Sequence, residues 1–258
     1  MWENIKDFYE RHKVWIAIGT HLITFVGGAI ATLGFINTKL NNSIDHIVAK
    51  RLAPYERLSG GSALNKAEDW EEAIAVLQTG IELPEFASLP LEVQNLMYDQ
   101  QLYALANCVE TEKHRPKLKR ITDRFDQKIV GDGWRYNQAG WFFLKDGDPT
   151  QARDYFKKSY AYYSKRQEWK SMNDPCRGLL WVALAEGKVG EATQEAEKTI
   201  LHNPVEFSWD ALHRESKTWD EEGWFLKYRN TYGRARFDET IKEYKKQLDM
   251  KVIPKPKG

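Results

Sequence analysis

The sequence predicts an all-α protein in which a single N-terminal transmembrane helix precedes a larger helical domain. Residues 14–36 contain no Asp, Glu, Lys or Arg, although 29% of the whole chain is charged. In the rest of the chain aromatic residues are plentiful, while Val and Ile do not gather into the alternating runs that indicate strands. These two observations predict a water-facing helical domain that is tied to a membrane.

Composition excludes several classes of function. Lys and Arg total 38 against 37 for Asp and Glu, so net charge indicates neither a nucleic acid nor an acidic substrate as the partner. Cys108 and Cys176 lie far apart and show no CxxC or metal-ligand spacing, so the sequence predicts no disulfide scaffold, metal centre or cofactor. We divide the chain into a juxtamembrane segment (1–13), a transmembrane helix (14–36), a linker or stalk helix (37–53), a helical-repeat domain (54–250) and a flexible tail (251–258).

Residues 14–36 are long enough to cross a bilayer as a helix. At about 1.5 Å per residue the stretch reaches about 35 Å, slightly more than the roughly 30 Å hydrocarbon core. A cleavable signal peptide is the rival interpretation, because Ala29-Ile30-Ala31 resembles a small-residue cleavage site. The acidic residues Glu3, Asp7 and Glu10 before the stretch, and its apolar continuation through Ile36, favour a retained anchor.

Small residues recur along one face of the expected transmembrane helix. This spacing lets helix backbones approach closely in lipid, so we expect the helix to self-associate, although Gly and Thr are common in membrane helices in any case. His21 lies beside this face, where it either hydrogen-bonds a neighbour across an oligomer interface or has a gating or proton role. The residues expected at this association face are Thr20, His21, Thr24, Gly27, Gly28, Ala31 and Thr32.

The charges that flank the anchor give a weak signal for orientation. Arg11 and Lys13 lie close to its N-terminal edge, whereas only Lys39 lies close to the other edge, which favours an N terminus inside the cell. In a wider window Lys50 and Arg51 nearly cancel this difference. We therefore expect the helical domain on the periplasmic or outer side and leave the cytoplasmic side open.

The linker is expected to form a short stalk helix. Ser43 is a candidate N-cap, and Pro54 ends or restarts the helix. Apolar residues recur at helical spacing between them, so a stalk of this kind would hold an oligomer in register. The residues of this apolar face are Ile44, Ile47, Val48 and Leu52.

A turn followed by a helix with a small residue near its start occurs three times, at 67–74, 147–152 and 187–192. In each case Ala is followed seven positions later by another small residue, and in the first two cases a large residue stands four positions after the Ala. In the first occurrence the Ala is Ala73, with Gly61 twelve positions before it and Leu77 and Gly80 four and seven positions after it. In the second the corresponding residues are Ala152, Gly140, Phe156 and Ser159. In the third they are Ala192, Leu180, Ala196 and Thr199.

This arrangement resembles the tetratricopeptide repeat family, whose units of about 34 residues are helix-turn-helix pairs with small residues where the two helices touch. The resemblance implies a solenoid of helical hairpins. It is strongest for the second unit, good for the first and partial for the third, where Leu180 replaces a Gly and Ala196 replaces a large residue.

The remaining segments fit the same pattern less closely. Residues 89–130 are expected to form a degenerate helical pair with apolar residues at Leu91, Leu96, Leu102, Leu105 and Ala106. One or two capping helices are expected after Pro204, and a last helix over 237–248. The residues that indicate the capping helices are Trp209, Leu212, Trp219, Trp224, Phe225 and Tyr228.

The resemblance also implies a binding groove, because the first helix of each unit lines a concave surface in this family. Aromatic anchors beside polar groups suit an extended peptide or a partner helix. The alternative is that the tryptophans are packed between units. The implied groove residues are Trp134, Asn137 and Trp141 in the second unit, Asp174, Arg177 and Trp181 in the third, and Tyr55, Leu58 and Ser62 in the first.

A basic run offers a second candidate site. On a helix its residues cover more than one face, so part of the run is a solvated surface, but it is also suited to anionic lipid head groups or a phosphorylated ligand. The residues are Lys113, His114, Arg115, Lys117, Lys119, Arg120 and Arg124.

Motifs that would indicate an enzyme are missing from the sequence. It contains no HExxH, GxSxG, Walker or dinucleotide motif, and His202 and His213 have no ligand-spaced partner. The leading hypothesis is a membrane-anchored scaffold or adaptor that binds a protein or peptide. The alternatives are a partner-controlled membrane effector, whose transmembrane helices oligomerise to perturb the bilayer, and a structural oligomer whose repeats bind copies of themselves.

Overall fold

The structure is a computed structural model that describes residues 38–125, 132–218 and 223–252. Within these ranges every regular element is helical and no strand is found, which confirms the all-α prediction. The chain divides into two compact units, residues 1–53 and residues 54–258. The predicted transmembrane helix at 14–36 lies outside the described residues, and among those that are described no helix has the length and apolar character needed to cross a membrane.

The described part of the first unit, residues 38–53, is helical. Ser43 lies inside this helix, so the prediction that a helix begins there is wrong. The predicted apolar residues remain uncovered: Ile44 is 47% exposed and Leu52 is 48% exposed. Leu40, at 56% exposure, extends the same row by one turn.

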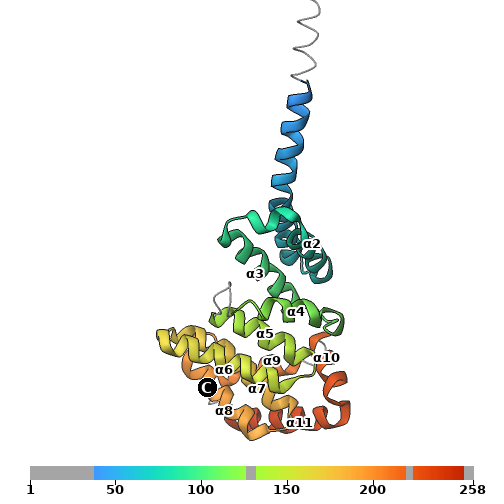
Figure 1. The fold of residues 1–258 in the computed structure, drawn as a ribbon. Coiled ribbons are helices and arrows are strands. Elements are labelled where there is room, and N and C mark those ends of the chain that lie inside the picture. Colours follow the sequence, from blue (N-terminus) through green and yellow to red (C-terminus); the bar gives the residue numbers. More distant parts are fainter. Residues whose placement is uncertain (1–37, 126–131, 219–222, 253–258) are drawn as a thin grey trace, which may run out of the picture. The chain divides into compact units, whose positions relative to one another are not determined.

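The second unit is built from helices that pack mainly on their neighbours in sequence, as Figure 1 shows. Helix α2 packs on α3, α5 on α6, α6 on α7 and α7 on α8, while α3 also packs on α5 and α11 on both α8 and α9. After a helical stretch at 54–66, the elements are α2 (Trp70–Glu82), α3 (Leu91–Asn107), α4 (Arg115–Thr122), α5 (Gly133–Lys145), α6 (Pro149–Arg166), α7 (Asn173–Ala185), α8 (Val189–His202), α9 (Trp209–Thr218), α10 (Gly223–Tyr232) and α11 (Arg234–Lys251), with 3-10 turns at Pro84–Ser88, Glu112–His114 and Trp169–Met172.

The three predicted turns share one backbone conformation. Gly147 and Gly187 have φ values of +85° and +78°, and Glu68 takes the same left-handed conformation at 61°. The residue that follows each of them is the N-cap of the next helix, with φ between −111° and −88° and ψ between 72° and 79°. In two of the turns this residue is an Asp whose carboxylate accepts a hydrogen bond from the helix, as in the 2.9 Å bond from Gln151 N to Asp148 Oδ1. The sequence repeat is therefore a repeat of local structure.

The small residues of the repeat lie where helices cross. Ala73, Ala152 and Ala192 are fully buried. The Phe156 ring packs so closely on two glycines that a Cβ built at Gly140 would lie 2.7 Å from it, and one at Gly178 would lie 2.3 Å from it. These glycines belong to α5 and α7. The Phe156 ring of α6 therefore joins a helix of the second predicted repeat to a helix of the third. Leu77 makes the equivalent contact in the first predicted repeat, where a Cβ at Gly61 would lie 2.4 Å from its Cγ.

The less regular segments follow the predictions in part. The expected helical pair over 89–130 is the long helix α3 and the short helix α4. Leu91 and Leu96 do not face the core, because they are 50% and 47% exposed, whereas Leu102 and Leu105 are buried as predicted. The expected capping helices are α9 and α10, with Trp219 outside the described residues, and the last helix runs over 234–251 rather than 237–248.

The contact between Gly178 and Phe156 gives a testable prediction. Gly178→Ala places a methyl group inside the van der Waals radius of the Phe156 ring, so we expect the free energy of unfolding to fall by about 1–3 kcal/mol. The measurement is urea unfolding of the detergent-solubilised chain. Gly190→Ala in α8 is the matched control, because a Cβ there meets nothing within 4 Å, and it should leave stability unchanged or raise it by less than about 1 kcal/mol. Equal stabilities of the two variants would contradict the described packing.

Candidate functional site

A cavity of about 820 Å³ lies among the helices of the second unit, and we call it the central cavity. Its wall includes side chains from α2, α3, α5, α7, α9 and α10. The structure brings five of the six predicted groove residues of the second and third repeats into this wall: Asn137, Trp141, Asp174, Arg177 and Trp181. The sixth, Trp134, packs half-buried against the hydrophobic core and does not line the cavity.

Aromatic pairs form much of the wall of the central cavity. Trp181 stacks on Tyr228 with their ring centroids 5.7 Å apart, and Trp70 meets Tyr103 edge to face at 5.6 Å. Trp181 is only 5% exposed, so packing between helices accounts for most of its surface. Trp141 is less buried and contacts Phe156 edge to face at 5.2 Å. Both tryptophans therefore pack against neighbouring helices and also line the central cavity.

Polar groups are placed between these aromatic rings. Arg177 Nη2 lies 3.3 Å from Glu215 Oε1, and the same guanidinium lies 5.1 Å from the centre of the Phe207 ring. Burial raises the pKa of Asp174, and the nearby Arg177 opposes this effect only in part. Asn137 is 4% exposed, and its Oδ1 has no hydrogen-bond partner among the described residues. The wall of the cavity thus combines a buried acceptor that lacks a partner, the Arg177 guanidinium and the carboxyl groups of Glu68, Asp174 and Glu215 with flat aromatic rings.

Lys145 places an amine at the edge of the central cavity. It lies at the end of α5, and its Nζ donates a hydrogen bond of 3.4 Å to the Cys108 carbonyl oxygen. Burial lowers the pKa of Lys145 to about 8, an effect that Cys108 opposes and Lys227 increases slightly. This amine is therefore able to gain or lose a proton in mildly alkaline solution.

The groove positions of the first repeat lie elsewhere. Tyr55, Leu58 and Ser62 line a separate cavity of about 440 Å³, together with Leu96 and Gln100 of α3. The predicted association face of the anchor, Thr20, His21, Thr24, Gly27, Gly28 and Ala31, lies outside the described residues.

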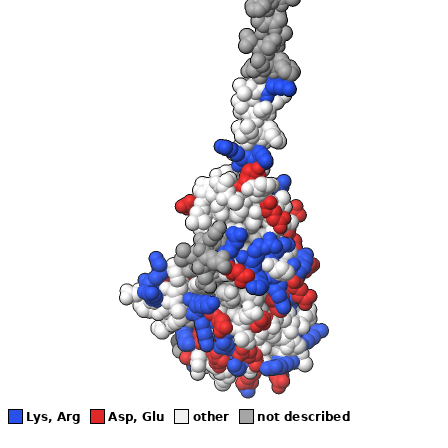
Figure 2. Space-filling view, in the orientation of Figure 1, with Lys and Arg blue, Asp and Glu red and all other residues white. Residues whose placement is uncertain are grey.

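The basic run is tied to acidic residues from several elements. Figure 2 shows Lys and Arg side chains gathered on this face of the molecule with Asp and Glu among them. His114 is buried, and Lys117 Nζ lies 3.1 Å from its Nδ1. An anionic ligand at this run would have to compete with existing ion pairs. These are Lys113 with Glu110 at 2.6 Å, Arg115 with Asp146 at 2.6 Å, Lys119 with Asp123 at 3.0 Å and Arg120 with Glu82 at 3.8 Å.

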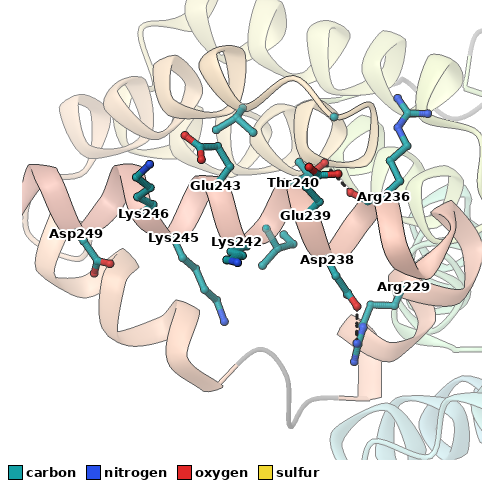
Figure 3. A pocket seen from close by; sticks show the side chains of 13 residues that line it. Arg229, Arg236, Asp238, Glu239, Thr240, Lys242, Glu243, Lys245, Lys246 and Asp249 are labelled. Atoms are coloured by element: carbon teal, nitrogen blue, oxygen red, sulfur yellow. Dashed lines mark hydrogen bonds and ion pairs between the residues drawn. The ribbon is translucent and has the colours of Figure 1, made fainter.

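A larger hollow of about 1250 Å³ runs along α11, but its charged groups do not converge. Figure 3 shows side chains leaving this helix in different directions, with Glu243 and Lys246 on one side and Asp238 and Asp249 on the other. Asp238 is held by Arg229 at 2.6 Å. Mixed charges that point apart do not define one ligand, so the central cavity is the stronger candidate.

Sequence reasoning missed several residues that complete the site. Trp70, Tyr103, Glu215 and Tyr228 line the central cavity but occupy none of the groove positions that the repeat pattern marks. It also missed the cluster of Glu71, Cys108 and His114, whose potential metal-ligand atoms all lie within 4.8 Å of one another. Their separation along the chain left no local spacing that could have revealed them.

Comparison with known proteins does not assign the chain to a family. No protein-family model, curated protein or solved structure matches it. The function therefore has to be argued from the geometry of the cavity itself.

The buried amine of Lys145 gives a prediction of pH dependence. Its pKa is about 8 in the folded protein and 10.5 in a free side chain, so burial of the charged form costs stability below pH 8 and the cost disappears between pH 8 and 10.5. Lys145→Met should be more stable than the wild type near neutral pH, by on the order of 2 kcal/mol. This difference should shrink to nothing as the pH approaches 10.5.

The measurement is urea unfolding of both proteins across this pH range. Comparing the two proteins at each pH removes the effect of the buried tyrosines, whose pKa values are raised by burial in both. A stability difference that does not change with pH would show that Lys145 carries no such cost.

Proposed function

We propose that this protein is a membrane-anchored helical-repeat adaptor that binds an extended segment of another protein in the central cavity. The observation that supports this most strongly is the convergence of Asn137, Trp141, Asp174, Arg177 and Trp181 on one cavity. These residues come from the first helices of two successive repeat units. The resemblance to the tetratricopeptide repeat family implies that these positions face the binding groove.

The chemistry of the cavity suits a peptide. An extended peptide presents backbone amide and carbonyl groups that need partners, together with side chains that seek apolar contact. The cavity offers Asn137 and Arg177 for the first need, and the faces of Trp141 and Trp70 for the second. Arg and Trp are also the residue types that dominate binding energy at protein interfaces.

The proposed architecture is a tetratricopeptide-like solenoid. Three turns with one backbone conformation support it, as do the close contacts of Phe156 with Gly140 and Gly178. A solenoid of this kind presents the first helices of its units along one side, and the central cavity is lined by two of the proposed first helices, α5 and α7.

The anchoring part of the proposal rests on residues 14–36, whose sequence contains no Asp, Glu, Lys or Arg. We place the helical domain on the outer side of the membrane and the self-association of the anchor at its stripe of small residues around Gly28. Association of the anchors would bring several cavities together on one surface, and a partner with repeated segments would then bind more tightly through multivalency.

A library of random peptides displayed on phage tests the proposal directly. Selection on the detergent-solubilised full-length protein should enrich a common motif, and synthetic copies of that motif should bind in a fluorescence anisotropy titration. Arg177→Ala should weaken this binding by at least about tenfold, because the substitution removes a cation from the cavity wall.

Arg166→Ala is the matched control. Arg166 is an exposed arginine near the end of α6 that pairs with Glu168 at 3.0 Å and does not line the cavity, so its loss should leave the affinity unchanged. If no motif is enriched, or if Arg177→Ala and Arg166→Ala bind the selected peptides equally well, the central cavity is not the peptide site.

A further inference from the structure

Three side chains with metal-ligand chemistry meet at the start of α2 and the end of α3. Glu71 lies in the first turn of α2, Cys108 directly follows α3, and His114 directly precedes α4. Their potential ligand atoms all lie within 4.8 Å of one another. Cys108 is 1% exposed and His114 is 4% exposed, so two of the three donors are shielded from solvent, whereas the Glu71 side chain is 43% exposed.

The donor set fits one cation better than others. A thiol, an imidazole and a carboxylate together favour Zn²⁺ over Mg²⁺ or Ca²⁺, which prefer oxygen ligands. Zinc bonds of about 2.0–2.3 Å place the ligands of a tetrahedral site about 3.3–3.8 Å apart. His114 Nε2 and Glu71 Oε2 are 2.9 Å apart, so small side-chain movements would bring the three donors to that spacing.

Two buried oxygens near these residues in the chain lack a hydrogen bond. Glu71 Oε1 and Thr111 Oγ1 have no partner among the described residues, and Thr111 is fully buried. A buried acceptor without a donor costs free energy, and most such atoms in proteins are satisfied by water, an ion or another group. Glu71 Oε1 belongs to the cluster itself. A cation bound there would give this oxygen a partner and remove the free-energy cost of leaving it unsatisfied.

The neighbouring lysines leave room for a cation. Lys113 Nζ lies 3.0 Å from Glu71 Oε2, but its side chain is 51% exposed and already bonds Glu110 at 2.6 Å. It can therefore release Glu71 and keep an ion pair. Lys117 is also partly exposed and can turn outward from His114 Nδ1, which then accepts a proton.

From this geometry we propose that Glu71, Cys108 and His114 bind a Zn²⁺ ion, with the fourth position open to water. Binding displaces the thiol proton of Cys108 to solvent, and the single ring proton of neutral His114 moves from Nε2 to Nδ1, so that Nε2 bonds the metal and the imidazole stays neutral. The ion would fasten the loop between α3 and α4 to the start of α2.

The test uses the full-length protein after removal of metal by a chelator. Dialysis against ZnCl₂ followed by elemental analysis should give one zinc per chain, and CoCl₂ should produce the ultraviolet charge-transfer band of a thiolate bound to cobalt. Cys108→Ser, His114→Gln and Glu71→Gln should each weaken zinc binding by at least about 100-fold, since even the outer-shell partners of metal ligands typically contribute about 10- to 100-fold.

Cys176→Ser is the matched control, because Cys176 is the other cysteine of the chain and is also buried. This variant should bind zinc and show the cobalt band like the wild type. Circular dichroism establishes whether each variant is folded. If Cys108→Ser does not fold, Glu71→Gln still provides the test. The proposal is overturned if the wild type binds no zinc, or if zinc binding and the cobalt band survive in folded Glu71→Gln or His114→Gln.

Discussion

The arrangement of the second unit depends on the contact of one aromatic ring with two glycines. Phe156 of α6 lies against Gly140 of α5 and Gly178 of α7 at distances that leave no room for a Cβ at either position. Three helices from two repeat units are therefore held at a short, fixed separation. Trp141 follows Gly140 in sequence and Arg177 precedes Gly178, so the same contact sets the width of the central cavity. A side chain at either glycine would move the wall of the cavity as well as the core.

A second link connects the central cavity to the cluster of Glu71, Cys108 and His114. The carbonyl oxygen of Cys108 accepts the hydrogen bond from Lys145, which lines the cavity, while its thiol lies in the cluster. The loop after α3 thus has one polar face toward each site. If zinc fastens this loop, it also fixes the Cys108 carbonyl oxygen that accepts the hydrogen bond from Lys145. The metal would then affect the cavity by positioning Lys145 and would not contact a ligand there.

Local sequence predicted much of the fold, because turns depend on a few residues. Gly147-Asp148 and Gly187-Lys188 predicted their turns correctly, and the groove positions implied by the resemblance to the repeat family include five residues that line one cavity. Contacts between segments that are distant in the sequence could not be predicted from local sequence. Glu71 and His114 are 43 residues apart, and Arg115 of the basic run forms an ion pair with Asp146, which directly follows α5. The exposure of Leu96 was also missed, because a helical period defines a face but not the neighbour that covers it.

The most direct test of the central cavity as a partner site is photo-cross-linking of the full-length protein in the cells that produce it. The photoreactive residue p-benzoylphenylalanine replaces Gln138, which lines the cavity, or Lys157, which is exposed on α6. The proposal predicts a discrete protein adduct from position 138 that position 157 does not give and that Arg177→Ala removes. Identical adducts from both positions, or an adduct from 138 that persists in Arg177→Ala, would contradict the binding of a partner in this cavity.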